Sequence, residues 1–276
     1  MATLAHPNSL RSELRLLWEM VRRSFQRQLT YRAATLAGLA TNFFFGLLRV
    51  AVMVALYGAR TEVAGLDLND AITYTGLAQA VIAYLSIFGW YDLMRSVSSG
   101  EVAADLLKPL SYFRYWLALD LGRATVAFLM RGLTIMLFYA LVFNITIPQG
   151  FIQWGALLLT LLLSWVLSFA WRFLVNLAAF WTPNAVGVGR FAFGIGWVLS
   201  GFFMPLRFFP VWFQTFCHFT PFPSMVNTVM EIYLGLLTGP ALAWALAVQL
   251  VWTIVLIAIC QFTLRAGVRK LVIQGG

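Results

Sequence analysis

Charged side chains are scarce in this chain of 276 residues: they make up 11% of it, against 61% for hydrophobic residues. A soluble domain carries about 25% charged residues because its surface must face water. The deficit excludes a soluble fold and indicates that most of the surface faces lipid. The apolar runs are also long enough, since about 20 apolar residues in a helix span the hydrocarbon core of a bilayer.

Cysteine, histidine and lysine are rare, with two residues of each. Cys217 and Cys260 are expected on opposite sides of the membrane, which excludes a disulfide between them and leaves both as packing residues. The two histidines, His6 and His218, cannot form a metal site with so few cysteines. Neither lysine lies in a glycine-rich phosphate-binding loop, and no G-x-S-x-G or H-E-x-x-H motif occurs. We therefore expect no catalytic residue, no metal ion and no cofactor in this chain.

Basic residues outnumber acidic ones, giving a formal charge of +9. They lie at the ends of apolar runs, where anionic lipid and the selection of topology explain them. No basic patch alternates with exposed aromatic residues, as nucleic-acid binding requires. Membrane lipid, and not nucleic acid, is the expected partner of these charges.

The apolar runs predict an all-α, polytopic membrane protein with a single transmembrane domain over residues 1–276. Residues 1–32 are expected in the cytosol as an amphipathic helix, residues 33–264 as a six-span bundle, and residues 265–276 as a cytosolic tail. The six spans are expected at residues 33–57, 71–93, 117–143, 154–181, 186–204 and 241–264.

An amphipathic helix is predicted before the first span, from about residue 10 to 29. Its apolar residues fall within about a 120° arc at 100° per residue, and its arginines lie off that arc. Such a helix is typical of the headgroup layer; a cytosolic helix packed against another element is the alternative. The apolar positions are Leu10, Leu14, Leu17, Trp18, Val21, Phe25 and Leu29.

Two connections contain prolines that interrupt helices. Residues 96–116 mix polar and apolar side chains around Pro109 and are too polar to span. The segment Pro205–Met225 holds four prolines and many aromatic residues, so it cannot form one straight helix. We expect it to be a broken, re-entrant or interfacial element between spans five and six, shielded by protein or by headgroups.

The orientation follows from the arginine and lysine counts. With the N-terminus in the cytosol, fourteen of the nineteen basic residues are cytosolic and only Arg60 and Arg207 are outside. The positive-inside rule therefore predicts that both termini are cytosolic.

Three arginines, Arg49, Arg131 and Arg172, are left at membrane depth. A charge at the bilayer centre costs at least about 2.5–3.5 kcal/mol, so it usually faces a polar pathway or a partner. Arg131 lies nearest mid-span and is predicted to face protein or a pathway. For Arg49 and Arg172 the alternative is that the side chain extends to the nearer interface. Asp120 and Arg123, one turn apart, are predicted to form a structural ion pair.

The fifth span is rich in glycine, and small residues let helices approach closely in lipid. We therefore expect this span to pack against protein. Its glycines are Gly187, Gly189, Gly194, Gly196 and Gly201.

Two connecting segments look familiar: GEVAADLLKPLSYFRYW (Gly100–Trp116) after the second span, and SGFFMPLRFFPVWFQTFCHFTPFP (Ser200–Pro223) between spans five and six. Both resemble the corresponding segments of the ABC-2-type permeases, which are the membrane subunits of bacterial ATP-binding-cassette exporters. The chain is most similar to the half-size, six-span permeases whose ATPase is a separate polypeptide.

The resemblance implies a dimer of permease subunits with two ATPase subunits docked on the cytosolic side, where ATP and Mg²⁺ would bind. Spans one, two and five would lie near the dimer seam, with Gly187, Gly194 and Gly201 on it. The N-terminal helix and the loop would contact the ATPase; the alternative is that the polar loop residues are only solvated. The implied coupling residues are Glu101, Asp105, Leu106, Leu107 and Lys108.

The sequence thus predicts a permease subunit in the bacterial plasma membrane. It would export an amphipathic or lipid-like substrate, paired with itself or with a similar permease. The alternatives are a secondary transporter or channel acting alone, which would favour internal repeats and acidic groups within spans, and a membrane scaffold that transports nothing.

Overall fold

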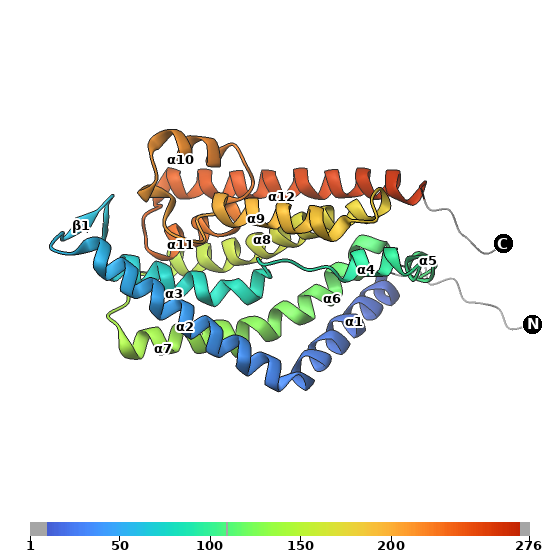
Figure 1. Ribbon diagram of the computed structural model, residues 1–276, viewed down its shortest axis with the longest axis horizontal. Helices are drawn as coiled ribbons and strands as arrows, with labels where there is room; N and C mark the ends of the chain where they lie inside the picture. Colours follow the sequence, from blue (N-terminus) through green and yellow to red (C-terminus); the bar gives the residue numbers. More distant parts are fainter. Residues whose placement is uncertain (1–9, 109, 271–276) are drawn as a thin grey trace, which may run out of the picture.

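The computed structural model describes residues 10–108 and 110–270, and most of them are helical (Figure 1). The helices are α1 (Leu10–Thr30), α2 (Arg32–Tyr57), α3 (Leu68–Leu85), α4 (Asp92–Ser98), α5 (Val102–Leu106), α6 (Tyr112–Ala127), α7 (Leu133–Val142), α8 (Phe151–Asn176), α9 (Ala185–Leu199), α10 (Val211–His218), α11 (Asn227–Tyr233) and α12 (Gly239–Val268).

Shorter elements join these helices. The π-helical turn η1 (Phe128–Gly132) makes α6 and α7 one continuous rod. Strands β1 (Glu62–Val63) and β2 (Leu66–Asp67) form an antiparallel hairpin before α3, with Glu62 opposite Asp67 and Val63 opposite Leu66. The 3₁₀ turns are η2 (Leu177–Phe180), η3 (Leu206–Phe208) and η4 (Pro223–Met225).

Four helical stretches of the described chain are long and apolar enough to cross a membrane: residues 33–57, 112–142, 151–180 and 239–268. They coincide with the expected first, third, fourth and sixth spans. The other two apolar helices are shorter than expected, because α3 has 18 residues and ends at Leu85, and α9 has 15 and ends at Leu199. The chain is therefore a multi-pass membrane protein, while the count of six spans stays a prediction.

The helices run roughly along the long axis of the molecule and define two ends (Figure 1). The start of α1, the helices α4 and α5, and the end of α12 lie at one end, which we call the α5 end. The β-hairpin, α10 and α11 lie at the other, which we call the α10 end. Both described chain ends therefore lie at the same end of the bundle.

The core surrounds α8, which packs against α12, α11, α3, α6 and α9. Its aromatic residues Phe169 and Phe173 are fully buried. Phe113 of α6 lies edge-on to both rings, with centroid distances of 5.2 and 5.0 Å. Such edge-to-face contacts add to the packing of a lipid-embedded bundle, where burial of apolar area alone drives little association.

The N-terminal helix α1 docks on the protein's own α6, so its apolar residues are divided between two surroundings. Its backbone passes directly over Gly122 of α6, and the Ser24 hydroxyl donates to the carbonyl of Leu119 at 2.6 Å. Leu14 and Trp18 remain exposed. One flank of α1 thus packs on protein, while its place in the headgroup layer stays a prediction. The Leu10 side chain lies outside the described residues.

The segment Pro205–Met225 is broken into short helices, as its prolines predict. Pro205 and Pro210 precede η3 and α10, and Pro223 is the first residue of η4. Proline fits the start of a helix, where its missing N–H would have no partner. In the connection at residues 96–116, Pro109 lies outside the described residues, as do the tail residues 271–276.

Candidate functional site

The second apolar run contains a non-helical break, which corrects the expected span at residues 71–93. The helix α3 ends because Ser86 adopts a left-handed conformation with φ of +52°, and residues 86–91 are irregular. The last carbonyls of a helix have no partners within it, so irregular backbone at membrane depth must be satisfied by surrounding protein.

Side chains of three other helices supply these partners. Arg123 of α6 donates to the carbonyls of Ala83 and Tyr84 at 2.6 and 2.9 Å. Further donors to the break are Ser168 to the Leu85 carbonyl (2.8 Å), Trp197 to the Ile87 carbonyl (2.7 Å) and Asn176 to the Trp90 carbonyl (2.6 Å). The break is therefore a built feature that connects α3 with α6, α8 and α9.

A buried ion cluster lies beside this break. Arg172 donates to both carboxylate oxygens of Asp120, at 3.0 and 2.8 Å, and Arg123 Nε donates to Oδ1 at 2.7 Å. The Trp165 indole also donates to Oδ2 at 2.9 Å. The expected ion pair between Asp120 and Arg123 is thus present, and Arg172 forms a second ion pair with the same carboxylate. Arg172 is 1% exposed and does not extend to an interface, because its partner is inside the bundle.

Arg49 of α2 contacts a second break, where α9 ends. Its Nη1 donates to the Phe202 carbonyl at 3.0 Å, and its guanidinium carbon lies 4.1 Å from the centre of the Phe202 ring. A cation over an aromatic face is stabilised, and more so when desolvated. Arg49 therefore ties α2 to the end of α9.

Arg131 projects from η1 toward α2. Its guanidinium lies flat on Gly38, where an added Cβ atom would be 2.6 Å from Nη2. Its one hydrogen bond to the described residues is a long one, 3.4 Å to the side-chain oxygen of Asn42. The Nε atom of Arg131 is buried and has no partner among the described residues.

The three predicted seam glycines lie in different surroundings. A Cβ atom at Gly194 would meet no other described atom within 4 Å, and Gly187 is exposed. Gly201 is buried, with φ of +78°, and the Tyr74 hydroxyl donates to its carbonyl at 2.7 Å. Gly201 thus shapes the break inside the protomer, and the place of all three glycines at a dimer seam stays a prediction.

The predicted coupling residues lie together at the α5 end: Glu101 immediately precedes α5, Asp105 and Leu106 are its last residues, and Leu107 and Lys108 follow it. Asp105 faces inward and accepts hydrogen bonds from Ser96 (3.1 Å) and Lys108 (2.5 Å). Leu106 is half-buried against the core, whereas Glu101 is exposed and Leu107 is 86% exposed. Two of the five predicted residues are thus presented outward, and three hold the connection together.

Lys108 is held by two neighbours. Its ammonium lies 2.5 Å from an Asp105 oxygen and 3.9 Å from the centre of the Tyr115 ring. Burial lowers the pKa of Lys108, but the hydrogen bonds to Asp105 and Tyr115 outweigh it, so the net pKa is raised. Lys108 is therefore charged at physiological pH, and this link between α5 and α6 is present.

The sequence reasoning did not identify a set of polar residues on α8, which we call the polar ladder. These residues recur every four positions and are all buried. Each forms a hydrogen bond to a different element: Thr160 to Gln249 of α12, Ser164 to the Met225 carbonyl of η4, Ser168 to the Leu85 carbonyl of α3, Arg172 to Asp120 of α6, and Asn176 to the Trp90 carbonyl in the break between α3 and α4. The spacing was available in the sequence, since residues four apart lie on nearly the same face of a helix.

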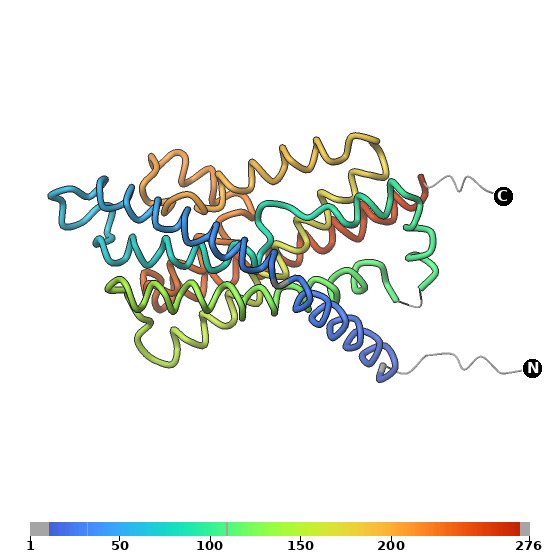
Figure 2. The backbone as a smooth tube through the Cα atoms, turned by 60° about the horizontal axis from the view of Figure 1, so that its bottom comes forward, coloured from blue at the N-terminus to red at the C-terminus, as the bar shows by residue number. Residues whose placement is uncertain are grey.

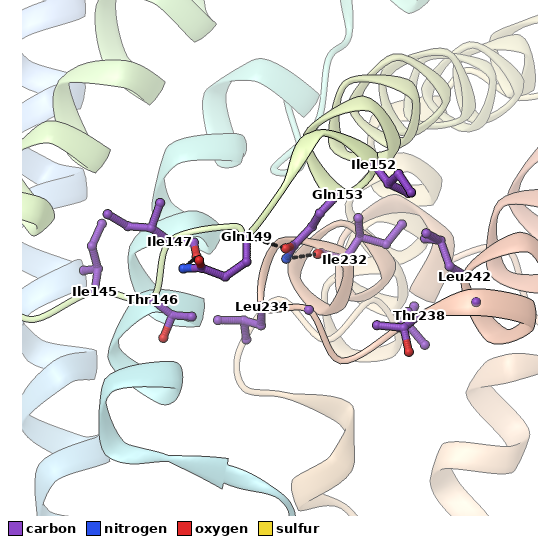
Figure 3. Close-up of a pocket in the computed structure, with 13 residues that line it drawn as sticks. Ile145, Thr146, Ile147, Gln149, Ile152, Gln153, Ile232, Leu234, Thr238 and Leu242 are labelled. Carbon is purple, nitrogen blue, oxygen red and sulfur yellow. Dashed lines mark hydrogen bonds between the residues drawn. The ribbon is translucent and has the colours of Figure 1, made fainter.

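A cavity of about 850 Å³ opens between the α7–α8 and α11–α12 connections (Figure 3). The described residues lining it are uncharged, and Gln153 crosses its wall, donating to the Ile232 carbonyl at 2.9 Å while accepting from the Gln149 N–H at 2.6 Å. These polar groups are satisfied by protein. The cavity is separate from the breaks and from the buried arginines, and none of the predicted site residues lines it.

The comparisons with known proteins assign this architecture to a family. A family model described as ABC-2 family transporter protein matches residues 43–275, which is most of the chain. No curated protein and no solved structure matches it. The matched region includes both breaks, the polar ladder and α5. The chain therefore belongs to the ABC-2 transporter family and is a membrane component of an ATP-binding-cassette transport system.

Proposed function

We propose that this chain is the permease subunit of an exporter in the bacterial plasma membrane, driven by a separate ATPase subunit in which ATP and Mg²⁺ bind. The family supports a role in such a system. The sequence has no phosphate-binding loop of the G-x-x-x-x-G-K-[ST] type. Energy for transport therefore has to arrive through contact with another subunit.

The observation that carries this proposal is the outward face of α5. Leu107 at the end of α5 is almost fully exposed, and Glu101, Ala103 and Ala104 are exposed as well. The face lies at the α5 end, together with the start of α1 and the end of α12 (Figure 1). A short helix that exposes an apolar residue and small residues suits a groove of a partner protein. We assign this face to ATPase binding, with both termini in the cytosol.

Movement of α5 can reach the bundle through α4. The N–H of Met94 donates to the side-chain oxygen of Asn176 of α8 at 3.1 Å. The side-chain nitrogen of Asn176 in turn donates to the Trp90 carbonyl in the break at 2.6 Å. A displacement of α5 by the ATPase would thus act on α8 and on the break in the second apolar run. Coupling through packed elements of this kind requires two arrangements of the same contacts, and the break is the non-helical connection between α3 and α4 at which we place this change.

A second permease subunit would pack on the outer face of α9, which carries Gly187, Gly194 and the exposed Phe191 and Val198. The partner would be a copy of this chain or a similar permease. Small and apolar residues on one face of a helix favour close helix contacts in lipid.

The substrate proposed for the complex is amphipathic or lipid-like. Phe88 lies in the α3 break and packs edge-on against Phe202, with 5.6 Å between centroids. Phe88, Phe191 and Phe203 are exposed in the protomer, so a pathway between two protomers near α9 would have aromatic walls.

The test is to purify the tagged chain in mild detergent and to measure the copurifying ATPase by mass and by ATP hydrolysis. The variant Glu101→Arg/Leu107→Asp is expected to reduce the bound ATPase by about tenfold or more, because it removes the exposed apolar side chain and reverses the charge of Glu101. ATP-dependent flux in reconstituted vesicles should fall with it, and wild-type flux should require the ATPase.

The matched control is Ile147→Asp, which changes an exposed apolar residue in the connection before α8. It should leave ATPase binding unchanged. Wild-type amounts of ATPase on the α5 variant would contradict the assigned surface. Flux without any ATPase would contradict the proposed function and favour a transporter or channel that acts alone.

A further inference from the structure

The helices α1 and α2 meet at an elbow (Figure 2). A cavity lies in this elbow, and Ser86 and Phe88 of the break after α3 are among its lining residues. Its volume is about 390 Å³, and it lies between the end of α1, the first turns of α2, the end of α3 and the α6–η1 rod. Its polar lining includes Gln28, Thr35, Thr41, Asn42, Arg123 and Arg131. None of the described residues that line it is acidic.

Two positive charges face this cavity without full compensation. Asp120 supplies one negative charge to both Arg123 and Arg172, which leaves the cluster with one excess positive charge. Arg131 adds a second, and its only hydrogen bond to a described residue is the 3.4 Å contact with Asn42. Charges inside a membrane protein are costly unless they are paired.

Donor groups are also left over on both arginines. A guanidinium has five N–H groups, and Arg123 uses three of them on Asp120, Ala83 and Tyr84. Arg131 leaves its buried Nε without a partner among the described residues. Planar guanidinium groups with free donors bind phosphate strongly.

An apolar groove of about 390 Å³ adjoins this cavity. The two share Gln28, Thr35 and Val126, and the groove continues along Leu36 and Met130. Leu36 is largely exposed on the outside of α2. A basic, donor-rich cavity that opens into an apolar groove fits a molecule with an anionic head and a hydrocarbon tail.

We propose that the elbow cavity binds the headgroup of an anionic phospholipid, with its phosphate at Arg131 and Arg123 and an acyl chain along Leu36 and Met130. In the predicted topology the elbow faces the cytosolic leaflet, where basic pockets between helices bind anionic headgroups. The bound lipid supplies the negative charge that the cluster lacks and fixes the angle between α1 and α2. Binding requires neither the ATPase nor transport.

The test uses the purified full-length chain and a phosphatidylglycerol with a photoreactive acyl chain. Trypsin cleaves after arginine, so crosslinks at Leu36 and Met130 are expected in the peptides of residues 33–49 and 124–131. Unlabelled phosphatidylglycerol should compete, while phosphatidylcholine should compete at least about tenfold less, or ~1.4 kcal/mol. Competition by soluble glycerol phosphate as strong as by the lipid would indicate a free-anion site and overturn the proposal.

Arg131→Gln is expected to weaken competition by phosphatidylglycerol about tenfold, and Arg131→Lys should retain most of it because the charge remains. In the Gln variant the second peptide extends to Arg172. Arg60→Gln, which removes an exposed arginine at the α10 end, is the control and should have no effect.

Equal crosslinking of Arg131→Gln and wild type would overturn the proposal. Should Arg131→Gln fail to fold, Leu36→Trp keeps both arginines and fills the groove from its exposed side. This variant must also lose the crosslink at residues 124–131, and unchanged labelling there would equally overturn the proposal.

Discussion

Asp120 shares its carboxylate between two arginines and an indole, and all four groups are at least partly buried. Its carboxylate thereby joins α6 with α8, while Arg123 carries the connection on to the end of α3. Removing one partner of a buried ion pair leaves the other charge uncompensated, which costs more than the pair itself contributes. At this position two cations would lose their anion together.

We therefore expect Asp120→Asn to lower the free energy of unfolding by about 3–5 kcal/mol. The measurement is the midpoint of thermal unfolding in detergent, followed by size-exclusion chromatography. Asp92→Asn is the control, since Asp92 pairs with Arg95 on the surface and such pairs contribute about 0–1 kcal/mol.

The double variant Asp120→Asn/Arg172→Gln should be less destabilised than the sum of its single changes, because the second change removes one orphaned charge. Strict additivity of the two changes would contradict direct coupling between Asp120 and Arg172.

At the scale of elements, α8 organises the bundle through its polar ladder. Residues four apart advance by about 400° on a helix of 3.6 residues per turn, so each step of the ladder turns by about 40°. Over its four steps the ladder winds nearly half-way around α8. Because of this rotation, the evenly spaced side chains contact α12 near the start of α8, and α3, α6 and α4 toward its end.

The contact between α1 and α6 depends on Gly122. A Cβ atom at this position would overlap the carbonyl oxygen of Val21 and the backbone nitrogen of Phe25, and these backbone atoms cannot move aside as a flexible side chain could. Gly122→Ala is therefore expected to displace α1 from α6, although alanine favours a helix more than glycine does.

Limited trypsin digestion measures this displacement, because an undocked helix loses the tertiary packing from which most of its stability comes. Cleavage at Arg22 and Arg23 should be several-fold faster in Gly122→Ala than in wild type. The control is Gly155→Ala, where an added Cβ meets no other described atom within 4 Å. Equal cleavage rates for the two variants would show that α1 does not need this close approach.

For the whole molecule, the topology can be tested with introduced cysteines. The native thiols are unsuitable reporters because Cys217 and Cys260 are both fully buried, and burial raises the pKa of Cys217. Wild type should therefore react slowly with a membrane-impermeant maleimide, since the thiolate is the reactive form. Thr215→Cys on the exposed face of α10 should react in intact cells, whereas Gln26→Cys on α1 should react only after permeabilisation.

The reverse pattern would place the α5 end outside and contradict the orientation derived from the basic residues. It would also contradict the assignment of α5 to ATPase binding, because the ATPase and its nucleotide are cytosolic. The labelling experiment therefore tests both the orientation of the chain and the assignment of α5 to ATPase binding.

The sequence by itself determined the membrane class, the positions of four long apolar helices, the amphipathic character of α1 and the broken segment before α12. These depend on local composition, helix length and proline, which act within a few turns of the chain. It also indicated that the arginines at membrane depth need partners, because the cost of a charge in lipid does not depend on the fold. The matched family agrees with the resemblance of its two connecting segments.

Only the tertiary structure decided where α3 and α9 stop, which partners the arginines have, and which loop residues point outward. A helix in lipid can break only where distant side chains satisfy its carbonyls, and the donors to residues 83–90 come from Arg123, Ser168, Asn176 and Trp197. Asp105 and Leu107 are two residues apart, yet one faces inward and the other outward, because Ser96 and Lys108 hold the carboxylate. Such contacts join residues far apart in the chain, so local sequence patterns do not determine them.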